Sequence, residues 1–235
     1  MKTTTVAPQE KFQYFDGIPL LAHLQVTASV KIRRQIYEWF KHQLCGVKGK
    51  KILDHGSTPD IQRLDSNCFI RWLIEDGAIV YATSPEKIDH LETSFPGLQV
   101  IPWPAQSSDL PALDGIISSA VIEHVGSRSN QLAYLESLLQ FNTNVLVTTP
   151  NRFHWVEFHT KVPLLHWLPP QLHRALLSLF GRSFWALEEN LNLFSKKDFC
   201  RLIDMTQVAY PEFASQYYYP HYLGRCSNLI ALLKK

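Results

Sequence analysis

Short apolar runs alternate with helical stretches through the middle of this 235-residue chain. The runs are entered through turns such as Asp76-Gly77 and Pro96-Gly97, and the last one stops at Pro150. Apolar runs without polar alternation indicate strands that are covered on both faces, as in a parallel sheet between two layers of helices. We therefore expect five parallel strands, at residues 52–54, 78–83, 98–102, 114–119 and 144–149.

Two stretches have the spacing of amphipathic helices. Residues 31–44 carry one apolar face, with basic side chains that we expect to point toward water: Lys31, Arg33, Arg34 and Lys41. Residues 128–141 carry a second apolar face, at Leu132, Leu135, Leu138 and Leu139. Ser195 with Asp198 three residues later predicts the start of a further helix.

The pattern changes after Pro150, where Trp, His, Pro and Leu become frequent. Residues 151–190 predict a small helical cap, with two short helices separated at Pro169-Pro170. Residues 213–219 and 228–233 predict a final antiparallel hairpin. We expect an N-terminal arm over residues 1–25 and one α/β domain over residues 26–235, with a Rossmann-like, doubly wound, mostly parallel sheet.

Composition narrows the functional classes. The 23 basic and 21 acidic residues leave a net charge of +2, which gives no basic field for binding nucleic acid. The four cysteines include no C-x-x-C pair, so neither a zinc site nor a redox dithiol is indicated. The polar start of the chain is unlike a secretory signal, and no apolar run reaches the length of a membrane span. We expect a soluble, cytoplasmic protein.

Candidate chemistry begins where the first predicted strand ends, at Asp54 and Gly56. A glycine there lets the backbone turn tightly and approach a ligand, although an ordinary strand-to-helix turn has the same appearance. The dinucleotide pattern G-x-G-x-x-G is absent, which argues against NAD and FAD.

The fourth predicted strand ends in small residues and is followed by an acid and a histidine. Ser118, Ser119 and Ala120 would let a flat ligand lie against the backbone. Glu123 and His124 follow on the next turn. Their alternative roles are structural, with Glu123 capping a helix and His124 packed as a polar residue.

These two segments together resemble the class I S-adenosylmethionine-dependent methyltransferases, and more closely a bacterial group of the broad type 11 kind. The segments Val121-Ile-Glu-His-Val125 and Thr148-Thr-Pro-Asn-Arg152 make the resemblance fairly specific, and it covers about residues 50–233. It implies a seven-stranded sheet whose reversed seventh strand lies between the fifth and sixth. It also implies that S-adenosylmethionine lies across the carboxyl ends of the first, second and fourth strands.

The resemblance implies cofactor contacts from five residues: Asp54, Gly56, Ser118, Ser119 and Ala120. The chain departs from the family pattern D-x-G-x-G-x-G after its first glycine, because Thr58 and Asp60 stand where later glycines would be. The Thr58 hydroxyl would either bind the cofactor's carboxylate or block the site. No acid ends the second strand, and Glu86 is the nearest substitute for the ribose-binding carboxylate.

The metal-binding E-x-x-E-H of some relatives is here Ala120-Val-Ile-Glu-His124, so we expect no metal. The cap follows the fifth strand, where the family's substrate sits. We expect a small-molecule or glycan-type methyl acceptor, and His159, with His124 and His154 less favoured, as the base that removes its proton. These histidines would otherwise only pack the cap.

Two other functions remain open at this point. The lost glycines and ribose acid favour a catalytically inactive binding module with the methyltransferase fold. A nicotinamide-dependent oxidoreductase is a second alternative. The oligomeric state is left open.

Overall fold

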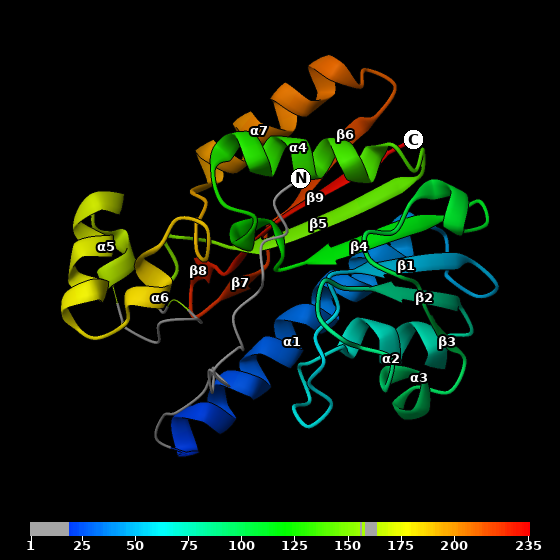
Figure 1. The fold of residues 1–235 in the computed structure, drawn as a ribbon, viewed down its shortest axis with the longest axis horizontal. Coiled ribbons are helices and arrows are strands. Elements are labelled where there is room, and N and C mark those ends of the chain that lie inside the picture. The colour runs from blue at the N-terminus through cyan, green and yellow to red at the C-terminus, as the bar shows by residue number, and fades with distance from the viewer. Residues whose placement is uncertain (1–18, 156, 158–163) are drawn as a thin grey trace, which may run out of the picture.

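A seven-stranded sheet between two layers of helices forms the body of the protein (Figure 1). The computed structural model describes residues 19–155, 157 and 164–235. The strand order is β3-β2-β1-β4-β5-β9-β6, in which β1 to β5 are parallel and β9 is antiparallel to both neighbours. The α/β, mostly parallel fold class is therefore confirmed, with the reversed strand in the expected place. The strands are β1 (Lys51–His55), β2 (Ile79–Thr83), β3 (Leu98–Val100), β4 (Gly115–Ser119), β5 (Asn144–Pro150), β6 (Ala214–Tyr218) and β9 (Asn228–Lys234).

The predicted strands agree with these bounds to within one or two residues. The largest difference is β3, which was expected to reach residue 102 and ends at Val100. Pro102 has no N–H to donate to the β2 ladder, so regular pairing stops before it. The predicted final hairpin is confirmed as the antiparallel pair β6 and β9.

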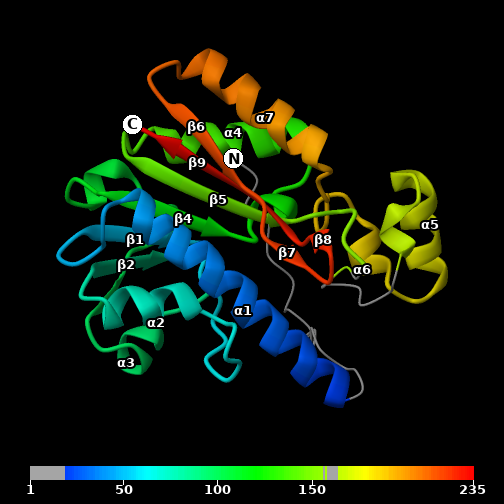
Figure 2. The same ribbon diagram turned by 180° about the vertical axis from the view of Figure 1, so that it is seen from behind.

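Helices cover both faces of the sheet, as Figures 1 and 2 show from opposite sides. One layer contains α1 (Pro19–Gln43), α2 (Cys68–Glu75) and α3 (Leu91–Ser94), and the other contains α4 (Arg128–Leu139) and α7 (Lys196–Ala209). Alternate residues of β1 serve the two cores: Ile52 packs with Phe40 of α1, and Leu53 packs with Leu135 of α4.

Helix α1 differs from the prediction in two ways. It begins at Pro19 rather than near residue 31, so residues 19–25 of the predicted arm are helical. Proline suits a first helical position, and residues 20–30 contain no glycine or proline that would end the helix. Arg33 was expected to face water but is half-buried, because its guanidinium reaches the loop that follows β1.

The cap lies beyond the carboxyl end of β5, away from the sheet (Figure 1). It consists of η3 (Leu165–Trp167), α5 (Pro170–Leu179) and α6 (Ser183–Ala186), and the break at Pro169-Pro170 is as predicted. Its own small core contains Leu177, Trp185, Leu191 and Leu193. A second pair of strands, β7 (His221–Tyr222) and β8 (Arg225–Cys226), lies beside the cap and was not predicted.

Helix α1 is 25 residues long, which matches the thickness of a bilayer, but charged side chains interrupt its apolar positions. None of the helices in the described part of the chain combines the length and the hydropathy needed to cross a membrane.

Candidate functional site

The turn after β1 is joined to the end of β2. Gly56 has a φ of 95°, and its N–H and that of Ser57 both donate to the Thr83 carbonyl, at 2.9 and 3.3 Å. The carboxyl ends of β1, β2 and β4 therefore meet at one edge of the sheet, which is where open α/β sheets bind ligands.

Asp54 lies buried at this edge, with only 8% of its surface exposed. The Ser57 hydroxyl donates to Asp54 Oδ1 at 2.5 Å. Burial raises the pKa of Asp54 to about 6, while the Ser57 hydrogen bond and the positive charge of Arg33 oppose that rise. Asp54 is thus an anionic side chain at neutral pH that the protein keeps away from bulk water.

A neighbouring side chain leaves no room for a Cβ at position 56, so only glycine fits there. A Cβ placed on it would lie 2.4 Å from Cγ2 of Val121, which belongs to the turn after β4. Ala120, just before Val121, has a φ of 58°. The turns after β1 and β4 therefore touch at Gly56, so Val121 fills space that the sequence alone suggested for a ligand.

The loop after Gly56 lacks the later glycines of the family pattern, and hydrogen bonds from side chains hold it instead. Thr58 N–H donates to Asn67 Oδ1 at 3.2 Å, and Asn67 Nδ2 donates to the carbonyls of Thr58 and Asp60, at 2.8 and 3.1 Å. The Ser66 hydroxyl donates to the Asp60 carboxylate at 2.7 Å. The Thr58 hydroxyl accepts from Asp60 N–H at 3.4 Å, so it is turned toward its own loop.

Ser118 points toward α4 and shares a hydrogen-bond network with β1. Its Oγ lies 2.7 Å from the Tyr134 hydroxyl, which lies 2.9 Å from Nδ1 of His55. Burial lowers the pKa of His55 to about 4, so this imidazole is neutral at physiological pH, and burial raises the pKa of Tyr134. Ser119 Oγ lies 3.1 Å from the hydroxyl of Thr148 on β5. Both serines hold neighbouring elements together.

Glu123 and His124 lie in η2 (Ile122–His124), directly after β4. Glu123 does not cap α4; Ser127 does, by accepting from Asn130 N–H. The Glu123 carboxylate is fully buried and accepts from the Thr149 hydroxyl at 3.0 Å. His124 Nδ1 donates to the Asn190 carbonyl at 2.6 Å, which joins the turn after β4 to the end of the cap.

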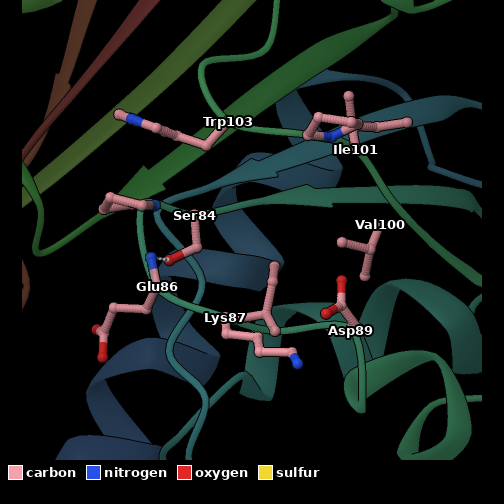
Figure 3. Close-up of a pocket in the computed structure, with 10 residues that line it drawn as sticks. Ser84, Glu86, Lys87, Asp89, Val100, Ile101 and Trp103 are labelled. Atoms are coloured by element: carbon pink, nitrogen blue, oxygen red, sulfur yellow. Dashed lines mark hydrogen bonds between the residues drawn. The ribbon is translucent and has the colours of Figure 1, made fainter.

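A pocket of about 380 Å³ opens at the carboxyl ends of β2 and β3 (Figure 3). It lies farther from β4 than the sequence suggested, because its lining comes from residues 84–89 and 100–103. Ser84 Oγ accepts from Glu86 N–H at 3.1 Å, and the Glu86 carboxylate points away from Asp89 and Val100. Partial burial raises the pKa of Glu86. Trp103, 43% exposed, packs its ring 5.0 Å from that of His55.

His154 joins the cap to the β7–β8 pair. It is 3% exposed, and its Nε2 donates to the Tyr222 carbonyl at 3.3 Å. Its own carbonyl accepts from His166 Nε2 at 2.9 Å and from Trp167 Nε1 at 2.8 Å. His159, the third candidate base, lies outside the described residues.

Sequence reasoning missed several residues that shape this edge: Arg33, Tyr134 and Val121, as well as Trp103. Asn67, whose side chain holds the loop after Gly56, was missed as well. The first four of these residues contact elements that are distant in the chain, so nothing in their spacing signals these contacts.

Neither a protein-family model nor a curated protein sequence matches this chain. Solved structures do match. Magnesium protoporphyrin IX methyltransferase from Synechocystis PCC 6803, with bound SAH, has a TM-score of 0.56 at 12% identity, over 94% of this chain and 91% of that chain. The S-adenosylmethionine-dependent methyltransferase SibL, in its apo form, has a TM-score of 0.53 at 12% identity, over 92% of this chain and 57% of that chain.

A methyltransferase from Mesorhizobium loti has a TM-score of 0.50 at 14% identity, over 80% of this chain and 92% of that chain. These matches give no support to a nicotinamide-dependent oxidoreductase. The strand order, the reversed β9 and these neighbours together show that the chain has the class I S-adenosylmethionine-dependent methyltransferase fold.

Proposed function

We propose that this protein transfers a methyl group from S-adenosylmethionine to a small-molecule or glycan-type acceptor. One observation carries the proposal: a pocket of about 380 Å³ opens where β2 and β3 end, in a fold whose neighbours include an enzyme crystallised with SAH. That volume lies within the range of about 300–1,000 Å³ usual for small-molecule sites.

We propose that the adenosyl half of the cofactor occupies this pocket, near Ser84 and Glu86. The other half would lie along the β1 and β4 turns, near the other candidate cofactor residues: Asp54, Gly56, Thr58, Ser118, Ser119 and Ala120. The cofactor supplies an electrophilic methyl group on a sulfonium. The chain supplies an anionic, largely dry environment at Asp54, which favours a positively charged donor.

The cap would hold the acceptor, aligned with the donor's methyl group. Of the described candidate bases, His124 has the more suitable geometry. Donation from Nδ1 to the Asn190 carbonyl selects the tautomer in which Nε2 carries the lone pair, as proton removal requires. His154 donates its Nε2 proton to Tyr222, which suits a structural role. His159 remains a candidate base on the resemblance alone.

A second function is favoured by a specific observation. Val121 packs against Gly56, and the loop over residues 57–67 uses its polar groups internally. Both features suit a catalytically inactive protein that keeps the fold and binds a partner through the cap.

Isothermal titration with S-adenosylhomocysteine separates the two functions. We expect saturable binding to the folded protein and no binding of NADH. Trp103→Ala removes an exposed wall of the pocket and should weaken binding about tenfold, since about 1.4 kcal/mol corresponds to that factor. Phe180→Ala is the control, because Phe180 is also exposed but lies at the end of α5. No heat at millimolar ligand would overturn the proposal and favour the inactive module.

A further inference from the structure

Trp103 forms one wall of the pocket, and little in its own segment fixes its indole. After β3 the chain is held to β2 as far as Pro102, whose carbonyl accepts from the Thr83 hydroxyl at 3.4 Å. The indole is 43% exposed, and Figure 3 shows it directed away from Ile101. Within the described part of the chain, the imidazole of His55 is the one aromatic ring that packs against it, at 5.0 Å between ring centroids. The position of the indole therefore depends on how His55 is held.

His55 is fixed by a chain of hydrogen bonds that starts on β4. Ser118 Oγ lies 2.7 Å from the Tyr134 hydroxyl on α4, which in turn lies 2.9 Å from Nδ1 of His55. Leu53 and His55 point to the same face of β1, toward α4, because side chains alternate along a strand. The imidazole is 6% exposed, and burial keeps it neutral at pH 7 by lowering its pKa to about 4. Its orientation is thus set by β4 and α4, while its ring contacts the pocket wall.

We propose that His55 is a positioning residue of the pocket: Ser118 and Tyr134 hold its ring, and its ring holds the Trp103 indole in place as a wall for a flat ligand. The inference rests on the proposed function, which puts the adenosyl half of the cofactor in this pocket.

Two physical effects support this role of His55. The two rings are tilted by 55°, and tilted aromatic pairs attract each other at centroid separations of about 4.5–7 Å, so the contact stabilises one position of the indole. A wall that is ordered before binding adds affinity, because the ligand does not have to immobilise it.

Substitution of His55 by asparagine separates the ring from the hydrogen bond. The shorter side chain of His55→Asn offers a polar atom near the place of Nδ1, which retains a partner for Tyr134, but it removes the ring that packs against Trp103. His221→Asn is the matched control, because His221 on β7 also makes a hydrogen bond through Nδ1, at 2.9 Å to the Tyr219 carbonyl. A role for His55 limited to fold stability would lower the free energy of unfolding without moving the indole in the folded protein.

The first measurement is fluorine-19 NMR of the folded protein labelled with fluorotryptophan, without added ligand. The Trp103 resonance is identified as the one lost in Trp103→Phe. We expect it to shift in His55→Asn and to stay in place in His221→Asn. An unchanged Trp103 resonance in His55→Asn overturns the inference. Should that variant not fold, Tyr134→Phe replaces it, because it releases the His55 ring, and an unchanged Trp103 resonance there overturns the inference.

The second measurement is the affinity for S-adenosylhomocysteine by isothermal titration, in a double-mutant cycle with Trp103→Ala. We expect His55→Asn to weaken binding by about threefold to tenfold, with the upper limit set by Trp103→Ala, which removes the whole wall. In the Trp103→Ala background the same change should weaken binding by less than about twofold, because His55 acts through Trp103. Equal losses in the two backgrounds would overturn the inference.

The two measurements together distinguish this inference from the proposed function. A Trp103 resonance that shifts in His55→Asn, in a protein whose wild type binds no S-adenosylhomocysteine, would support the positioning of Trp103 and refute the proposed function. Wild-type binding of S-adenosylhomocysteine together with an unmoved resonance would refute the role of His55 alone.

Discussion

Gly56 belongs to two turns at once, since its φ of 95° shapes the turn after β1 while Val121 of the β4 turn packs against it. Alanine at this position would be strained, and its Cβ would meet Val121 Cγ2 at 2.4 Å. We expect Gly56→Ala to lower the free energy of unfolding by about 2–4 kcal/mol, measured by urea denaturation. Adding Val121→Ala should recover the part due to the clash. Equal stability of Gly56→Ala and wild type would contradict this contact.

Asp54 makes stability depend on pH in an unusual direction. Its folded-state pKa of about 6 lies above its unfolded value of 3.8, so the folded state binds the proton more tightly and loses stability as pH rises between these values. A difference of about two units corresponds to about 3 kcal/mol. The free energy of unfolding of Asp54→Asn, relative to that of the wild type, should therefore rise by up to about 3 kcal/mol as the pH increases from 3.5 to 7.5. Denaturant unfolding of both proteins across this pH range measures the difference. A difference that does not change with pH would refute the interpretation of Asp54 as a buried carboxyl group with a raised pKa.

At the scale of elements, α4 holds the ends of β1 and β4 through one tyrosine. Tyr134→Phe preserves the ring but removes the hydroxyl that contacts Ser118 and His55. Two buried polar groups would lose this partner, so we expect a loss of about 2–4 kcal/mol in unfolding free energy. Tyr217→Phe is the control, because that hydroxyl lies 3.5 Å from Asp204 near the surface. We expect the control to change stability by less than about 0.5 kcal/mol.

At the scale of the whole molecule, partly buried polar contacts join the cap to the sheet body. Arg152 donates through Nε to the His166 carbonyl at 2.9 Å and through Nη2 to the Leu168 carbonyl. Arg152→Met should increase hydrogen exchange in η3 and α5 and leave β4 and β5 protected, because local opening follows local contacts. Arg174→Met, which loses only a surface pair with Glu188, is the control. Equal exchange in both variants would show that Arg152 does not hold the cap.

The candidate site was predictable in part. Glu86, one of the predicted cofactor contacts, lines the pocket, whereas Asp54 and Gly56 do not and stay predictions that rest on their places at a strand end and a turn. The direction in which each side chain points could not be predicted from the sequence. Ser118 faces Tyr134 rather than an open slot, and the pocket lies at the ends of β2 and β3. A one-residue step along a strand reverses the face of the sheet, so a motif alone leaves open which residues line a cavity.

The sequence by itself determined the succession of buried strands and helices, the break in the cap and the reversed final hairpin, because hydrophobic periodicity and turn chemistry act over a few neighbouring residues. Only the tertiary structure decided that Arg33 is half-buried beside the loop after β1, and that Val121 rather than open space lies against Gly56. These contacts join residues tens of positions apart. They depend on how packed elements fit together, which no local pattern encodes.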